Sequence, residues 1–204
     1  MDIFQITKLA GHVIGAYLLG SVPFGLILTK IFTSYDIRAE GSGNIGATNV
    51  RRVAGTALGA MTLAGDFLKG AIPVYIAAVL TGNKGSCSEF YIAVTAIAAF
   101  WGHLYPVFLK FKGGGKGVAT AAGCFLVISP VSFLAAIMLF AIIIFFYRRV
   151  SAGSLAASAL LPFVVWTTNH SFLYTFCAVI ISAFIIFRHR ENIKRLLSGT
   201  EPEI

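Results

Sequence analysis

The chain has 204 residues, of which 57% are hydrophobic and 12% charged, and its mean hydropathy is +0.85. This composition is too apolar for a soluble domain. The net charge of +8 would suggest nucleic acid in a soluble protein, but here it must be judged by where the basic residues fall. The three cysteines are widely spaced, which indicates neither a disulfide framework nor a zinc site. We therefore expect an all-α polytopic membrane protein with one domain over residues 1–204.

The apolar runs, taken in chain order, predict the membrane-spanning helices. Leu9 to Phe32 is interpreted as the first span, because it is longer than the apolar core of a signal peptide. Val53 to Leu80 and Phe90 to Leu109 predict two more spans. The long run from Val118 to Phe187 contains three interruptions, at Pro130, Arg148–Arg149 and Asn169.

The basic residues indicate how the chain is oriented. Thirteen of the 16 Lys and Arg residues fall in the 33–52 loop, the 110–117 loop, the pair at 148–149, the tail after 187 and at Lys30. Lys8 and Lys84 lie on the other side, and Lys69 lies inside an apolar run. Since positive charges collect in cytoplasmic loops, the crowded side is predicted to be cytoplasmic.

For all these basic segments to lie on one side of the membrane, the 118–187 run must cross it four times, which gives about seven spans. The N-terminus would then be outside and the C-terminus cytoplasmic. Val118 to Ile128 is shorter than the roughly 17 residues that a full crossing needs. Five spans with a re-entrant piece are therefore the alternative.

The first cytoplasmic loop contains "EGSGNIGATNVRR", from Glu40 to Arg52. Its glycines fit the spacing of a dinucleotide fingerprint, but a membrane span precedes it where that motif needs a strand. Glycines let backbone N–H groups converge on an anion, and Arg52 can bind a phosphate with its planar guanidinium. We favour an anion site over an ordinary flexible turn. Its candidate ligands are Ser42, Gly43, Asn44, Thr48, Asn49 and Arg52.

The second loop, "FKGGGKGVAT" (Phe111 to Thr120), places Lys116 among glycines just before an apolar helix. It is not a Walker A motif, because neither Ser nor Thr follows the lysine. A lysine at a helix N-terminus nevertheless suits a phosphate. The alternative is a lysine that extends to lipid head groups. The candidate glycines of this loop are Gly114, Gly115 and Gly117.

Polar pairs follow in the second half of the chain. His189 and Asn192 are three residues apart and would share a helical face, as would Ser151 and Ser154. Each pair fits either a catalytic role or a structural one, since serine often lies in helix–helix contacts.

Three ionisable residues in apolar runs are interpreted as structural. Asp66 and Lys69 are expected to form an ion pair one helical turn apart. His103, interpreted as lying in mid-span, is expected to be a hydrogen-bonded structural histidine. The chain has only eight acidic residues, and they are scattered, so no carboxylate cluster for Mg²⁺ is expected. We therefore expect no metal and no cofactor.

Three segments together resemble the bacterial acyl-phosphate:glycerol-3-phosphate acyltransferases, the PlsY family. They are "GSGNIGATNVRR", "GHLYPVFLKFKGGGKGVAT" and "RHRENIKRLLSGTE", with "DFLKG" and "VSAGS" as weaker matches. The resemblance implies a seven-span, multi-pass enzyme of the bacterial inner membrane, with its active site facing the cytoplasm. Its implied substrates are acyl phosphate and glycerol 3-phosphate, and its products lysophosphatidate and phosphate, in phospholipid biosynthesis. No nucleic-acid partner is expected, and the protein is expected to be a monomer.

The resemblance also implies roles for the candidate residues. The first loop would hold one phosphate, and Lys116 with its glycines would hold the other or stabilise developing negative charge. His189 and Asn192 would orient glycerol phosphate or polarise the carbonyl, and Ser151 or Ser154 would donate to the carbonyl oxygen. The competing interpretation is an anion transporter, but transporters usually show repeats and a midplane site.

Overall fold

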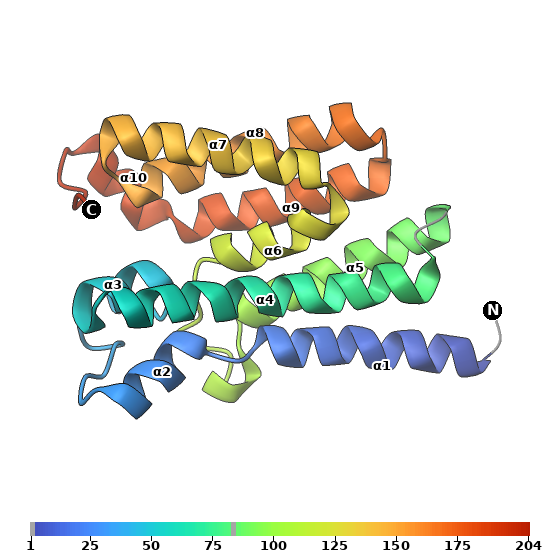
Figure 1. The fold of residues 1–204 in the computed structure, drawn as a ribbon, viewed down its shortest axis with the longest axis horizontal. Helices are drawn as coiled ribbons and strands as arrows, with labels where there is room; N and C mark the ends of the chain where they lie inside the picture. The colour runs from blue at the N-terminus through green and yellow to red at the C-terminus, as the bar shows by residue number, and fades with distance from the viewer. Residues whose placement is uncertain (1–2, 83–84) are drawn as a thin grey trace. The chain divides into compact units, whose positions relative to one another are not determined.

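The computed structural model describes residues 3–82 and 85–204, and within them every regular element is a helix and none is a strand (Figure 1). The all-α prediction is therefore confirmed. The chain divides into two compact units, one ending at Cys124 and the other running from Phe125 to Ile204. Each unit is described by itself.

The first unit is built around three long helices, α1, α4 and α5, which lie side by side (Figure 1). Small residues allow the close approach of their backbones. A Cβ at Gly20 would collide with the carbonyl of Ala99, and one at Gly102 with that of Tyr17. The helices of this unit are α1 (Ile3–Gly20), α2 (Phe24–Phe32), α3 (Ala47–Ala54), α4 (Thr56–Thr81), α5 (Ser86–Leu104), the short 3-10 helix η1 (Val107–Leu109) and the start of α6 (Val118–Ile128).

The predicted span from Leu9 to Phe32 is divided into two helices, α1 and α2, with a bend of 43° between them. The break precedes Pro23, which lacks a backbone N–H and disfavours helix at Val22. After the bend, α2 packs against α3 and α4. The second half of the expected span therefore supports the loop that contains residues 40–52.

A second break separates α3 from α4 at Gly55, whose φ of 91° is readily adopted only by glycine. The expected polar loop over 33–52 thus ends in a helix rather than running directly into the next span. A small apolar core holds this region together, with Leu58 and Leu109 packed on its edge. Its buried members are Leu26, Ile37, Ile45 and Val50.

The second unit consists of three long helices and a short terminal one. α8 contacts both α7 and α9, and α10 contacts α8 and α9. The helices are α7 (Pro130–Tyr147), α8 (Val150–Asn169), α9 (Phe172–Arg188) and α10 (Arg190–Leu197). The predicted interruptions at Pro130, Arg148–Arg149 and Asn169 all coincide with helix boundaries.

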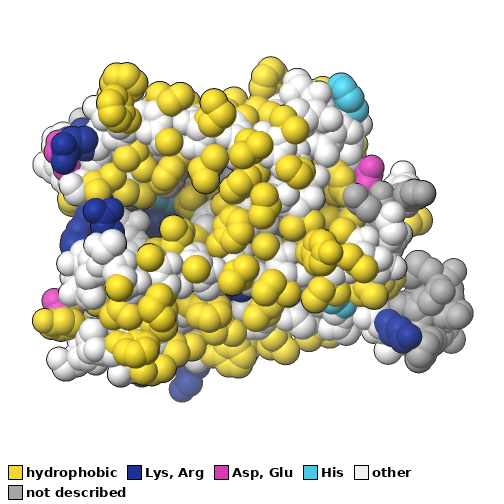
Figure 2. All heavy atoms as spheres, viewed as in Figure 1, with side chains coloured by type: hydrophobic (Ala, Val, Ile, Leu, Met, Phe, Trp, Pro, Cys, Tyr) yellow, Lys and Arg dark blue, Asp and Glu magenta, His cyan; other side chains and the backbone are white. Residues whose placement is uncertain are grey.

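The helix surfaces are apolar, as expected in a bilayer. Phe145 and Phe146 are 79% and 72% exposed, and hydrophobic side chains are spread over the visible face (Figure 2). Within residues 3–82 and 85–204, four helices are long and apolar enough to cross a membrane, or up to six segments if each bent pair counts as one span. α6 has only 11 residues, so the count of seven spans stays a prediction. Lys84, used in the orientation argument, lies outside the described residues.

Candidate active site

The first loop is organised around the buried side chain of Asn49, at the start of α3. Its Nδ2 lies 3.2, 3.0 and 3.0 Å from the carbonyl oxygens of Ile37, Glu40 and Asn44. Its Oδ1 accepts a hydrogen bond of 2.8 Å from the N–H of Ser42. All these partners are backbone atoms, so the amide fixes the path of the loop from inside.

The other candidate residues of this loop lie nearer its surface. Ser42, Gly43, Thr48 and Arg52 are exposed, and Asn44 is half-buried. Asn44 Oδ1 accepts from the N–H of Gly46, 2.9 Å away, just before α3 begins without a side-chain cap. The exposed hydroxyl, guanidinium and helix N-terminus together form a surface that suits an anion.

The glycine-rich loop lies between η1 and α6 and packs tightly on the end of α5. The N–H of Gly115 donates to the carbonyl of His103, 3.2 Å away. A Cβ at Gly115 would collide with the His103 ring, and one at Gly114 with the carbonyl of Leu104. Gly117 is also buried, against Phe100. Steric fit therefore explains why glycine occupies these positions.

Lys116 is half-buried and lies two residues before the first residue of α6. This places a lysine at a helix N-terminus, as the sequence predicted. The positive end of the helix and the ammonium group favour the same ligand, an anion such as phosphate.

A buried charged cluster lies on α4 and α5 of the same unit. Lys69 Nζ lies 2.8 Å from Asp66 Oδ1 and donates to the carbonyl of Val22 at 2.9 Å. His103 Nδ1 lies 3.6 Å from the same Asp66 oxygen. The predicted ion pair is confirmed, and His103 is a buried structural neighbour of it. His103 lies at the last turn of α5 rather than in mid-helix, because α5 ends at Leu104.

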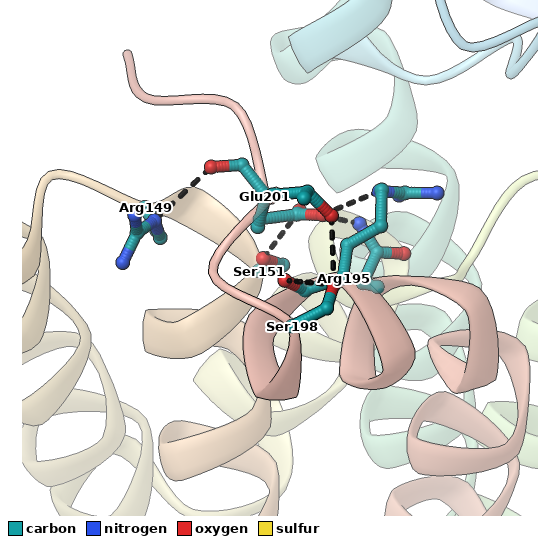
Figure 3. A network of polar contacts seen from close by, with 7 residues as sticks. Arg149, Ser151, Arg195, Ser198 and Glu201 are labelled. Carbon is teal, nitrogen blue, oxygen red and sulfur yellow. Dashed lines mark hydrogen bonds and ion pairs between the residues drawn. The ribbon is translucent and has the colours of Figure 1, made fainter.

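In the second unit, the candidate residues are joined by a carboxylate that the sequence interpretation missed (Figure 3). Glu201 Oε1 accepts hydrogen bonds of 2.6 Å from both Ser151 Oγ and Asn192 Nδ2. Its Oε2 accepts from Arg195 Nε at 2.7 Å. Arg149 Nε donates to the Glu201 carbonyl at 3.1 Å. The segment after α10 therefore ties α8 to α10.

The environment of Glu201 controls its ionisation. Burial acts to raise the pKa of its carboxyl, but the hydrogen bonds from Ser151, Asn192 and Arg195 outweigh that effect and lower the pKa below its ordinary value. Glu201 is therefore a carboxylate at neutral pH, able to orient the two candidate residues that donate to it.

The two remaining candidates of this unit are also buried. Ser154 Oγ donates to the carbonyl of Val150 at 2.9 Å, and His189 Nδ1 lies 2.8 Å from the carbonyl of Ile185. Ser151 and Ser154 lie in the first turns of α8, as expected, whereas His189 lies in the break between α9 and α10 and so is not on the same helix as Asn192. The bond to Ile185 fixes the His189 ring with respect to the end of α9.

The part of the chain that the structure describes contains no group of three His, Cys, Asp or Glu side chains arranged to hold a metal ion. The candidate residues offer basic side chains, hydroxyls, amides, an imidazole and backbone N–H groups, and Glu201 accepts hydrogen bonds from two of them. This arrangement defines an integral membrane helical protein whose loops suit anionic ligands.

Comparison with known proteins identifies the family. A family model described as glycerol-3-phosphate acyltransferase matches residues 10–199. Relatives with that name include one from Geotalea daltonii, 53% identical over 93% of this chain and 94% of its own length. Another, from Syntrophotalea carbinolica, is 50% identical over 98% and 97% of the two chains.

Solved structures agree with this match. A crystal structure of PlsY (YgiH), described as an integral membrane glycerol 3-phosphate acyltransferase in its glycerol 3-phosphate form, has a TM-score of 0.90 and 41% identity, covering 97% of this chain and 96% of that one. The lysophosphatidic acid form has a TM-score of 0.87 and 40% identity, covering 97% and 95%. The chain belongs to the glycerol-3-phosphate acyltransferase family, and the resemblance drawn from the three motif segments is confirmed.

Proposed function

We propose that this protein transfers a fatty acyl group from acyl phosphate to the 1-hydroxyl of sn-glycerol 3-phosphate. The products are 1-acyl-glycerol 3-phosphate and inorganic phosphate, in the first acylation of phospholipid synthesis. The observation that carries the proposal is the family match over residues 10–199, which includes the first two motif segments and all but the last two residues of the third. Family relatives are named for glycerol 3-phosphate as the acceptor, and the donor is inferred from the compact anion-binding loops of this chain.

The reaction needs one bond to form and one to break. The 1-hydroxyl oxygen attacks the acyl carbonyl carbon, and the bond from that carbon to the phosphate oxygen then breaks. Phosphate leaves with the electron pair of that bond, and the hydroxyl proton passes to a substrate phosphate. Because a mixed anhydride has a good leaving group, positioning and electrostatics supply most of the rate enhancement.

Two constellations in the first unit suit the substrate phosphates. One is the first loop, where Ser42, Gly43, Asn44 and Thr48 lie around the start of α3 and Arg52 is exposed on it. Asn49 contributes by holding that loop in shape through its four backbone contacts. The other is Lys116 with Gly114, Gly115 and Gly117, at the N-terminus of α6.

The second unit supplies the groups that orient the acceptor and the carbonyl. Ser151 and Asn192 are held by Glu201, and His189 is held by the carbonyl of Ile185. We assign His189 and Asn192 to the glycerol phosphate, and Ser151 or Ser154 to the carbonyl oxygen. The acyl chain lies in the hydrocarbon of the bilayer.

The site is proposed to face the cytoplasm of a bacterial cell, with seven spans and the C-terminus inside. Single cysteines at Ser42, Lys112 and Arg149 should then react only with permeant reagents in intact cells. The native Cys87 is exposed in the first turn of α5, at the end of that helix predicted to be outside, so it serves as the matched control that impermeant reagents label. Labelling of position 149 from outside would favour the five-span arrangement.

The function is tested with purified protein in detergent, palmitoyl phosphate and radiolabelled glycerol 3-phosphate. An acyltransferase forms labelled lysophosphatidate although no second compartment exists. An anion transporter forms none under these conditions, so absence of turnover in folded protein would contradict the proposal.

A further inference from the structure

The buried cluster of Asp66, Lys69 and His103 lies directly beneath the glycine-rich loop. The three residues are 3%, 2% and 3% exposed, in helices that the sequence assigns to the membrane. Ionisable groups in such a position are costly, even when they are paired. Pairing Asp66 with Lys69 alone would satisfy the charges, so the presence of His103 beside them calls for a separate explanation.

His103 contacts the cluster with one edge of its ring and the loop with the other. Its Nδ1 is the atom nearest Asp66, at 3.6 Å. Its Nε2 is the atom that a Cβ at Gly115 would strike first. The loop is also attached to the same residue through its backbone, since the Gly115 N–H donates to the His103 carbonyl. The imidazole therefore lies between a fixed carboxylate and the residue that precedes Lys116.

We propose that His103, held by Asp66, is a positioning residue that supports Gly115 and thereby sets where Lys116 presents its charge. The ring forms the floor of the glycine-rich loop, and the carboxylate fixes the ring's orientation. Glycine is required at 115 because any side chain would displace this floor. The inference rests on the proposed function in one respect, which is that Lys116 binds a substrate phosphate.

The key variant is His103→Asn. Asparagine keeps a donor near the position of Nδ1 and so retains a partner for Asp66, but it lacks the ring edge that meets Gly115. Asp66 also keeps Lys69, which helps the variant to fold. The matched control is His12→Asn, because His12 is a partly buried histidine in the same unit that bonds to the Pro73 carbonyl.

The kinetic readout separates positioning from folding. Lys116→Ala first shows which substrate depends on this loop, as the substrate whose KM rises. His103→Asn should raise the same KM by roughly 10- to 100-fold, the range expected for a small misplacement, and leave the other KM near its original value. His12→Asn should change neither. Equal rises in both KM values, or none, would overturn the proposal.

A double-mutant cycle tests whether His103 acts through Lys116. In the Lys116→Ala background, His103→Asn should have little further effect on that KM, because the charge being positioned is gone. Additive losses would show that His103 acts elsewhere. If His103→Asn fails to fold, Gly115→Ala tests the same contact from the loop, and an unchanged KM in that variant would equally overturn the proposal.

A measurement that does not depend on turnover completes the test. Amide hydrogen exchange of the peptide covering residues 112–117, in detergent without substrate, should be several-fold faster in His103→Asn than in the natural protein or in His12→Asn. Unchanged exchange would overturn the inference even if the enzyme is active. Faster exchange in a protein with no acyltransferase activity would support the proposal that the His103 ring holds the loop in place, and it would contradict only the proposed function.

Discussion

Two buried carboxylates, Asp66 in the first unit and Glu201 in the second, support candidate site residues in different ways. Asp66 lies within a long apolar helix and is paired with Lys69, one turn along the same helix. Glu201 lies beyond the last helix and gathers donors from α8 and α10. One partner of Asp66 is supplied by local helix geometry, whereas Glu201 also accepts from Ser151, which is 50 residues away in the sequence and lies on another helix. Substitutions at the two carboxylates should therefore differ in their effects on stability and on activity.

The largest effect is expected for Asp66→Ala. This change leaves the Lys69 ammonium buried without its carboxylate, and breaking a buried pair from one side costs about 3–5 kcal/mol of stability. Thermal unfolding in detergent should show a large fall in Tm. The double variant Asp66→Ala with Lys69→Met should recover much of the loss, because the uncompensated charge is gone. A Tm unchanged by Asp66→Ala would contradict the importance of this pair.

Arg52→Ala should reduce activity by roughly 100-fold or more while leaving the protein folded, because it removes a charged donor proposed to bind a substrate phosphate and so to position that substrate. Unlike either carboxylate, Arg52 is exposed, so its role should appear in turnover rather than in Tm. Arg51→Ala is the matched control, with an expected change of roughly twofold, typical of a surface site. Equal losses in the two variants would indicate a diffuse basic patch.

Glu201→Gln should cost about 1–3 kcal/mol of stability. The amide oxygen can still accept from Ser151 and Asn192. The amide nitrogen then faces Arg195 Nε, and because both groups are donors, no hydrogen bond forms between them. Activity should fall more than stability predicts, because a neutral amide oxygen holds Ser151 and Asn192 less firmly than the carboxylate does. This is checked by measuring the activity of Glu201→Gln relative to the natural protein at a temperature where both are folded. If the activity equals that of the natural protein, Glu201 has no role in orienting the site residues.

The pH dependence of stability should show a smaller effect of the same carboxylate. The pKa of Glu201 is lowered in the folded state, so its contribution is complete above the ordinary value of 4.5 and is lost as pH falls below it. Glu201→Gln should flatten this part of the curve of Tm against pH. Asp36→Asn is the control, since the pKa of Asp36 is about 2 beside Arg38 but both side chains are on the surface. A flattening of the same size in the control would contradict the assignment.

The sequence predicted those parts of the fold that depend on local pattern. The helix boundaries at Pro130 and Arg148 follow from proline geometry and charge, and the boundary at Asn169 follows from an uncharged polar break in the apolar run. The break at Pro23 was missed, since a long apolar run looks like one span. Its position is stabilised by a tertiary contact, from Lys69 to the Val22 carbonyl, that no local pattern reveals.

The candidate site shows the same division. Residue types and spacing indicated the two loops that we propose to bind anions, and they predicted the pairing of Asp66 with Lys69. They did not indicate that Asn49 binds its own loop from inside, or that Glu201 joins Ser151 to Asn192 across 50 and 9 residues of sequence. The only available signal for Glu201 was its position at the end of the third motif segment, in an acid-poor chain.

The central claim is that acyl phosphate is the donor. The most direct measurement compares palmitoyl phosphate with palmitoyl-CoA and palmitoyl–acyl carrier protein, each with glycerol 3-phosphate and purified protein in detergent. We predict turnover with palmitoyl phosphate, one inorganic phosphate released for each lysophosphatidate formed, and little or no turnover with the two thioesters. Comparable turnover from palmitoyl-CoA, or lysophosphatidate formed without stoichiometric phosphate, would contradict the account.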